Sequence, residues 1–201
     1  MLKQFSLRLL PIHISRNDYR IQIADFGTRF FDPDDWSIDN NSFLRLTEGL
    51  SLTIDLFAHV SNTKFERFCS FIRSPATLAT DVFYFSWHNE IAWICPPVNL
   101  VISAIKKICF SRMQAIVIVP FWRSASFWPV VFPDGDHAIS QCWKIVRFQP
   151  FVIRGPFCDN ELLQGRTKFT FLAMYISSAG LGYCKSPGLV SVSESSVLNF
   201  Q

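Results

Sequence analysis

One stretch of this 201-residue chain constrains its fold more than any other: two apolar runs of strand length, separated by a single amphipathic segment. Residues 91–94 form a short apolar run that a Cys-Pro-Pro turn ends, because proline supplies no donor to a strand ladder. In residues 100–111 the apolar side chains recur at helical spacing, and residues 115–119 are continuously apolar. Strand, turn, helix and strand make a βαβ unit with two parallel strands. We therefore predict an α/β fold: a small, open, mainly parallel sheet with a Rossmann-like βαβ unit, plus irregular flanks.

Outside this unit the signals of secondary structure are weaker. Residues 50–58 alternate apolar and polar side chains, which is the period of a strand. The other elements that we predict are a short strand at residues 68–72, a helix at 75–87, a loop-rich segment at 123–140, and apolar stretches at 144–153 and 167–176.

The composition indicates a packed core. The chain is 49% hydrophobic and 17% charged, and 21 Phe and 6 Trp stand against 8 Gly, which excludes disorder of the whole chain. The net charge of +3 is too small to indicate a nucleic-acid binder by itself. No two of the 6 cysteines are close enough in sequence to suggest a zinc site or a redox pair.

The sequence shows no signal for secretion or for the membrane. Arg8 and Pro11 interrupt the apolar N-terminus, and no cleavage site of small residues follows. The longest apolar run, residues 115–122, is far shorter than the roughly 20 residues that span a bilayer. We expect a cytoplasmic or nuclear protein that is not secreted and has no membrane partner.

Three of the predicted strands end in residues that could converge on one site. These are Asp55, the turn at residues 95–98, and residues 120–122. In open α/β sheets, ligands bind outside the carboxyl ends of the strands, where a carboxylate accepts hydrogen bonds from a ribose or an amino group. The alternative is structural: Asp55 caps a turn and the prolines only end a strand. The residues alone leave both interpretations open.

Several spaced pieces of sequence occur in a fixed order in the centre of the chain. They are residues 54–58, 62–68, 81–83 with Trp87, 95–98, and 117–122 with Trp128. With these pieces, residues 50–130 resemble the Dam-type adenine methyltransferases of phages and mobile elements, in the divergent form found in polyproteins of DIRS-like retrotransposons.

This resemblance implies a catalytic motif that has degenerated. In active relatives the Pro-Pro turn lies between an Asp or Asn, which accepts from the target amino group, and an aromatic ring, which stacks on the flipped base. Here the four positions are Cys95, Pro96, Pro97 and Val98. A thiol is a weak acceptor and valine has no ring, so both catalytic devices are missing.

The same resemblance implies where the methyl donor would bind. Asp55 and Asp81 take the polar positions of the S-adenosylmethionine site, but residues 56–62 contain no glycine for a donor-binding turn. We therefore expect no cofactor, and S-adenosylmethionine only if the methyltransferase-like site still functions.

The N-terminal flank carries a second likeness, in residues 13–19 and 23–29. It resembles the end of a retroelement RNase H domain, which implies that Asp25 is the last metal-binding carboxylate of that domain. Two-metal hydrolysis needs several carboxylates, and the strands that would supply the others are not in the chain, so we expect no RNase H activity and no bound metal.

Residues 31–38 and 162–177 resemble joining segments of the same polyproteins. The resemblances imply three parts: an RNase H C-terminal remnant and linker at 1–46, a degenerate Dam-like methyltransferase α/β domain at 47–155, and a connecting segment with a flexible tail at 156–201.

Our leading hypothesis is a retrotransposon-derived polyprotein fragment without catalytic activity, which associates with nucleic acid or acts as a scaffold. Its expected partners are DNA or RNA and other parts of a retroelement polyprotein. The first alternative is an S-adenosylmethionine-dependent DNA adenine methyltransferase-like enzyme, and the second is a decayed open reading frame without selected function. Four basic side chains flank the predicted pocket and fit phosphate binding: Lys106, Lys107, Arg112 and Arg123. A solvated helix end explains the first three equally. Trp122 and Trp128 fit base stacking or core packing.

Overall fold

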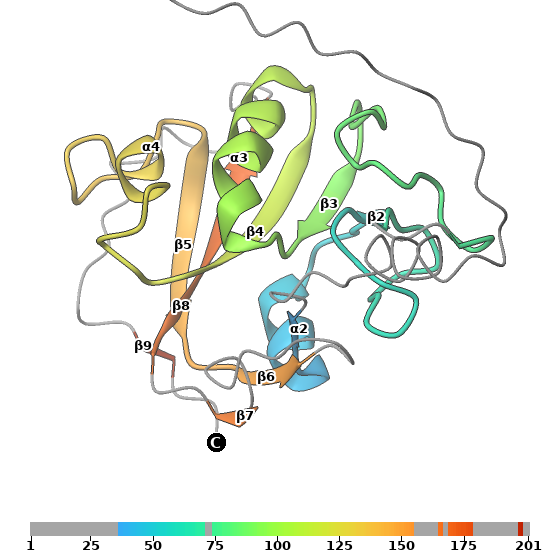
Figure 1. The fold of residues 1–201 in the computed structure, drawn as a ribbon. Coiled ribbons are helices and arrows are strands. Elements are labelled where there is room, and N and C mark those ends of the chain that lie inside the picture. Colours follow the sequence, from blue (N-terminus) through green and yellow to red (C-terminus); the bar gives the residue numbers. More distant parts are fainter. Residues whose placement is uncertain (1–35, 71–73, 155–164, 167–168, 179–196, 199–201) are drawn as a thin grey trace, which may run out of the picture. The chain divides into compact units, whose positions relative to one another are not determined.

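The computed structural model describes residues 36–70, 74–154, 165–166, 169–178 and 197–198 (Figure 1). All of these belong to one compact unit, which runs from Asp32 to Gln201. Asp25 and the segment resembling the end of an RNase H domain lie outside the described residues.

A central sheet of six strands organises the described residues. In spatial order the strands are β2 (Ile54–Asp55), β3 (Ile91–Ile94), β4 (Gln114–Pro120), β8 (Phe171–Ser177), β5 (Cys142–Phe148) and β9 (Val197–Leu198). β2, β3 and β4 run parallel to one another, whereas β8 runs antiparallel to both of its neighbours. The α/β class is thus confirmed.

The prediction of a mainly parallel sheet is not confirmed. The two longest pairings, of β8 with β4 and of β8 with β5, are antiparallel, so the sheet is mixed. Parallel neighbours need a long crossover, usually a helix. The described residues between β5 and β8 instead form the short strands β6 (Phe151–Arg154) and β7 (Gly165–Arg166). β8 is therefore one reversed strand within a sheet whose other strands share a direction.

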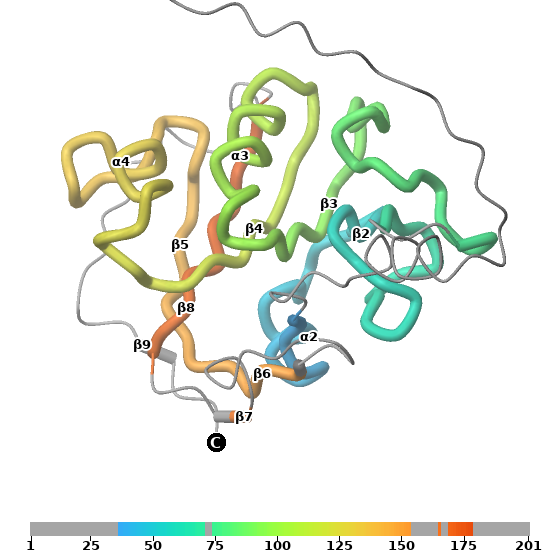
Figure 2. Tube along the Cα trace, in the orientation of Figure 1, coloured from blue at the N-terminus to red at the C-terminus, as the bar shows by residue number. Residues whose placement is uncertain are grey.

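The βαβ unit forms where the sequence predicts it. A short 3-10 turn (Val98–Leu100) leads into α3 (Val101–Phe110), which packs on one face of the sheet together with α4 (Trp128–Val131) (Figures 1 and 2). The buried stripe of α3 keeps the predicted helical spacing and consists of Val101, Ala104, Ile105 and Ile108. Because β4 starts soon after α3 ends, the last turn of the helix lies at the amino ends of the strands.

The other face of the sheet is covered by the segment that precedes β2. It contains β1 (Trp36–Ile38) and α2 (Asn40–Thr47), and β1 pairs antiparallel with β6. The Asp39 side chain caps α2, because its Oδ1 accepts from the Ser42 amide at 2.9 Å. The buried Tyr175 hydroxyl donates to the Leu46 carbonyl at 2.6 Å and ties α2 to the sheet. Residues 36–46, which we assign to the N-terminal part, thus share a core with the sheet.

The helix predicted at residues 75–87 is wrong. Turns occupy this segment, because side chains take the backbone groups that a helix would pair. The Asp81 Oδ1 atom accepts from the Phe83 amide at 2.8 Å, and the Trp87 indole donates to the Val82 carbonyl at 2.8 Å.

The two strands predicted near Asp55 are shorter than expected. Of residues 50–58, only Ile54–Asp55 pairs as a strand. The described part of 68–72 contributes isolated bridges, from Phe68 to Asp55 and from Cys69 to Ala79.

Candidate functional site

Parallel pairing brings the predicted strand ends together, as the sequence indicates. Asp55 lies opposite Trp93 and Ile94 lies opposite Val117, so the ends of β2, β3 and β4 meet at one edge of the sheet. We call this the carboxyl edge: Asp55, residues 95–98 and residues 120–123, with the end of β5. The amino edge is the opposite one, formed by residues 81–90 and 106–113.

Asp55 is a buried carboxylate with one atom left unpaired. It is 2% exposed, and its Oδ2 atom accepts from the Lys64 amide at 3.1 Å. Its Oδ1 atom has no hydrogen-bond partner among the described residues. Burial raises the pKa of Asp55 to about 7, against the lowering effects of the Lys64 and Phe57 amides and of the Lys64 charge. Asp55 therefore holds its own loop in place and keeps one acceptor atom without a donor.

Lys64 connects the Asp55 loop to α2. Its ammonium donates to Asn40 Oδ1 at 2.9 Å and lies 5.7 Å from the centre of the Phe43 ring. Burial lowers the pKa of Lys64, and the charges of nearby acidic groups, Asp55 first, oppose the shift. The sequence did not single out Lys64, although it lies within a piece, residues 62–68, that carries the resemblance.

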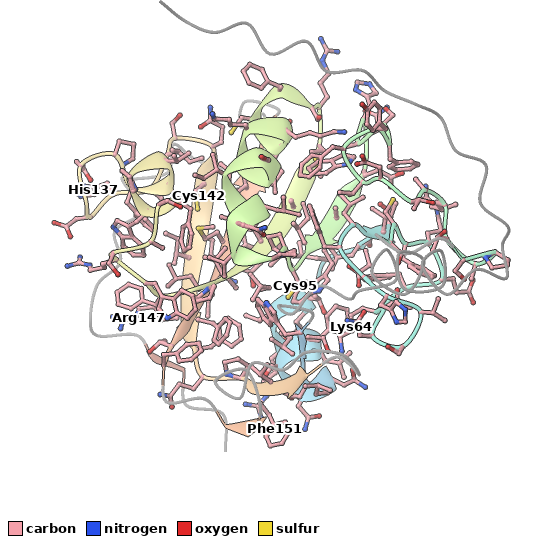
Figure 3. The ribbon with its side chains drawn as sticks, viewed as in Figure 1. Lys64, Cys95, His137, Cys142, Arg147 and Phe151 are labelled. Atoms are coloured by element: carbon pink, nitrogen blue, oxygen red, sulfur yellow. The ribbon has the colours of Figure 1, made fainter. Side chains whose placement is uncertain are left out.

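The Cys-Pro-Pro-Val motif is built into the packing at the end of β3. Cys95 is 7% exposed and lies beside α2 in Figure 3, with its Sγ atom 4.0 Å from the Trp36 carbonyl. Pro96 is buried, and the Pro97 carbonyl accepts from the Leu100 amide at 2.9 Å. Val98 is half-buried against the core beneath α3. The motif thus turns the chain from β3 into α3.

The cationic side chains of the carboxyl edge interact with neighbouring side chains. The Arg147 guanidinium lies over the Phe121 ring, 4.2 Å from its centre, and its Nε atom is buried without a described hydrogen-bond partner. Arg123 pairs with Asp136 at 2.7 Å. Trp128 is 5% exposed, which supports core packing over base stacking for this residue.

A cavity of about 440 Å³ opens at the amino edge. Its walls are the turn at residues 83–88 and the end of α3 with the residues after it, 107–112. Tyr84 and Phe110 are each 90% exposed. Neither Asp55 nor the Cys-Pro-Pro-Val motif lines this cavity.

Lys107 fixes the turn that forms one wall of this cavity. Its ammonium donates to the carbonyls of Phe85 at 2.8 Å, of Val82 at 3.4 Å, and of Phe83, and lies 4.7 Å from the centre of the Trp87 ring. Burial lowers the pKa of Lys107, and the Asp81 charge opposes the shift. Asp81, predicted for the donor site, therefore belongs to this turn, and no described interaction joins it to Asp55.

The four basic side chains that we expected around one pocket lie at two edges. Lys106, Lys107 and Arg112 lie at the amino edge, because a crossover helix runs back along the sheet and ends where the next strand begins. Arg123 follows β4 and lies at the carboxyl edge.

The described residues contain no group of three side chains able to hold a metal ion. None of the helices that they form is long and apolar enough to cross a membrane. No protein-family model matches the chain, and a search of the curated proteins finds no match.

Proposed function

We propose that this chain is a methyltransferase-like domain of a retroelement polyprotein that has lost methyl transfer and acts by associating with nucleic acid. The observation that carries this proposal is the state of the Cys95-Pro96-Pro97-Val98 motif. Its first side chain is a buried thiol whose Sγ atom lies 4.0 Å from the Trp36 carbonyl, and its last is a half-buried aliphatic group that packs against the core. The motif therefore offers a target amino group no acceptor side chain other than a weak, buried thiol, and it offers a base no aromatic ring for stacking.

The described residues do not fit S-adenosylmethionine. Asp55 offers a free acceptor atom, which favours the enzyme alternative, but the side chain is buried and does not line the amino-edge cavity. Asp81 caps a turn that Lys107 holds at the other edge. No glycine lies in residues 56–62. We therefore derive no methyl-transfer step.

The arrangement of strands supports a fold derived from an open Rossmann-like sheet. Five strands share one direction, and one reversed strand, β8, is inserted among them. Mixed sheets are common among large sheets, but in doubly wound folds the reversed strand is typically at an edge, whereas β8 lies between β4 and β5. The pieces that carry the resemblance lie on β2, on β3 and on β4 with the loop after each.

Two assays on the full chain test the proposal. Calorimetry with S-adenosylmethionine and transfer of a labelled methyl group to single- and double-stranded DNA should both give no signal. Fluorescence anisotropy with a labelled oligonucleotide should show binding that weakens with salt, because bound phosphates release counterions. Methyl transfer that Asp55→Ala abolishes would overturn the loss of catalysis, and absence of any oligonucleotide binding would overturn the nucleic-acid role.

A further inference from the structure

We infer that the amino-edge cavity binds single-stranded nucleic acid, with Tyr84 and Phe110 stacking on bases and with Lys106 and Arg112 contacting phosphates. This inference rests on the proposed nucleic-acid role and names its site. It places the ligand at the edge opposite to the one where an open α/β sheet usually binds its ligands.

The first support is the exposure of two aromatic rings beside a concave surface. Tyr84 and Phe110 are each 90% exposed, and they come from the two walls of the cavity. Large apolar side chains gathered on a surface indicate a binding site more often than scattered ones do. Flat rings suit bases, because every base has a face on which an aromatic ring can stack whatever the sequence.

The second support is positive charge without a partner. Lys106 and Arg112 are exposed, and neither side chain forms a hydrogen bond or an ion pair with a described residue. The acidic side chain of this turn, Asp81, is engaged by the Phe83 amide. The carboxyl edge differs, because Arg123 is paired with Asp136 there. The amino edge is therefore the more favourable of the two for phosphate groups.

The third support is that the aromatic wall is held rigidly. Lys107 binds three carbonyls of the turn, and the Trp87 ring beneath it is 1% exposed. The rings of Phe83 and Trp87 stack with centres 6.0 Å apart. Tyr84 is thus displayed on a fixed turn and Phe110 on the last turn of a packed helix, so binding costs little ordering of the protein.

The size of the cavity is compatible with a ligand site, and its exposed rings and cations favour a single strand. Its volume of about 440 Å³ lies within the range of about 300–1,000 Å³ that is usual for ligand sites. A duplex keeps its bases stacked inside and cannot offer their faces to Tyr84 and Phe110. A second copy of this chain is disfavoured as the ligand, because its cationic side chains would repel those of the first copy. An acidic peptide matches the charge but offers no stacked bases.

The test is fluorescence anisotropy of the full chain with a labelled oligothymidylate of about 12 nucleotides, which falls within the usual size of such sites. Replacing both rings, as Tyr84→Ala with Phe110→Ala, should weaken binding at least about tenfold, because each stacked base contributes substantially. Arg112→Ala should weaken binding and lower the slope of log affinity against log salt by about one. Because these side chains are exposed, circular dichroism of each variant should match that of the unaltered chain.

Trp122→Ala, at the carboxyl edge, is the matched control and should leave the affinity unchanged within about twofold. Binding that Trp122→Ala reduces and the double ring variant does not would overturn the inference while the nucleic-acid role stands. Equal affinity for duplex DNA, or equal displacement by polyglutamate, would also overturn it, because neither ligand presents free bases. No binding by the unaltered chain would overturn the proposed function together with the inference.

Discussion

The two edges of the central sheet differ in how exposed their candidate functional side chains are. At the carboxyl edge, the chain covers its own functional positions: Asp55 is buried, and Cys95 packs against the segment that holds β1 and α2. At the amino edge, a cavity lies open between Tyr84 and Phe110. The strand ends that usually bind a ligand are thus part of the core here. The accessible aromatic and basic side chains lie at the opposite edge of the sheet. The topology of a fold predicts where a ligand site is expected, but the packing of the chain decides whether that site is accessible.

The largest difference between the edges should appear when one aromatic ring is removed from each. Trp36 is 3% exposed, and its ring centre lies 5.0 Å from that of Phe171. Trp36→Ala should lower the free energy of unfolding by about 3–5 kcal/mol, because it leaves a cavity in the core, and should make Cys95 accessible to alkylation. Urea denaturation and mass mapping of the labelled cysteine measure both effects.

The matched change at the amino edge is Phe110→Ala. This ring is 90% exposed, so the free energy of unfolding should change by less than about 0.5 kcal/mol. Equal losses in the two variants would contradict the description of one edge as core and the other as surface.

The next effect concerns the pH dependence that Asp55 gives to stability. Because burial raises its pKa to about 7 in the folded chain, Asp55 binds a proton more tightly folded than unfolded. Its contribution is fully present below pH 4 and is lost as the pH rises to about 7, by about 4 kcal/mol at most. Asp55→Asn removes this titration, so the stability of the variant relative to the unaltered chain should rise across that window. Parallel stability profiles from pH 4 to 8 would contradict this account of Asp55.

A smaller effect distinguishes two adjacent lysines at the amino edge. Lys107 donates to three carbonyls of the turn, whereas Lys106 is exposed. Lys107→Met should lower the free energy of unfolding by about 2 kcal/mol, because partly buried carbonyls lose a charged donor. Lys106→Met removes the same charge and should change it by less than about 0.5 kcal/mol. Equal thermal denaturation curves for the two variants would show that charge alone matters at this edge.

The smallest effect distinguishes a buried hydroxyl group in the core from an exposed one at the amino edge. Tyr175→Phe removes the donor to the Leu46 carbonyl and should cost about 1 kcal/mol of stability, since α2 loses its buried link to the sheet. Tyr84→Phe removes an exposed hydroxyl group and should cost nothing measurable. Denaturation curves of the two variants that coincide would contradict the role of Tyr175 in holding α2.

The sequence predicted the βαβ unit because its signals are local: the apolar spacing of residues 100–111 and the proline stop after residue 94. It also predicted that Asp55 and Cys95 follow adjacent strands. It did not predict the direction of β8, because a continuous apolar run indicates a buried strand but not whether that strand pairs parallel or antiparallel. The predicted helix at 75–87 failed because Lys107, distant in sequence, binds the carbonyls of that segment.

The same limit applies to the site. The sequence placed Asp55 and the Cys-Pro-Pro-Val motif at the carboxyl edge. It did not predict the burial of Asp55 and Cys95, because burial depends on long-range packing, such as that of Cys95 against the segment that holds β1 and α2. The amino-edge cavity was missed because its two walls, around Tyr84 and Phe110, are far apart in sequence. The signal available was three basic residues, Lys106 and Lys107 within α3 and Arg112 after it, and they were assigned to the same pocket as Asp55.

The central claim is that nucleic acid meets this chain at the amino edge and not at the carboxyl edge. Photochemical cross-linking of a single-stranded oligonucleotide to the full chain, with mass mapping of the attached peptides, tests it most directly. We expect cross-links at Tyr84 and Phe110, and an excess of unlabelled oligonucleotide should abolish them by competition. Cross-links confined to residues 95–98 or 120–123 would contradict it.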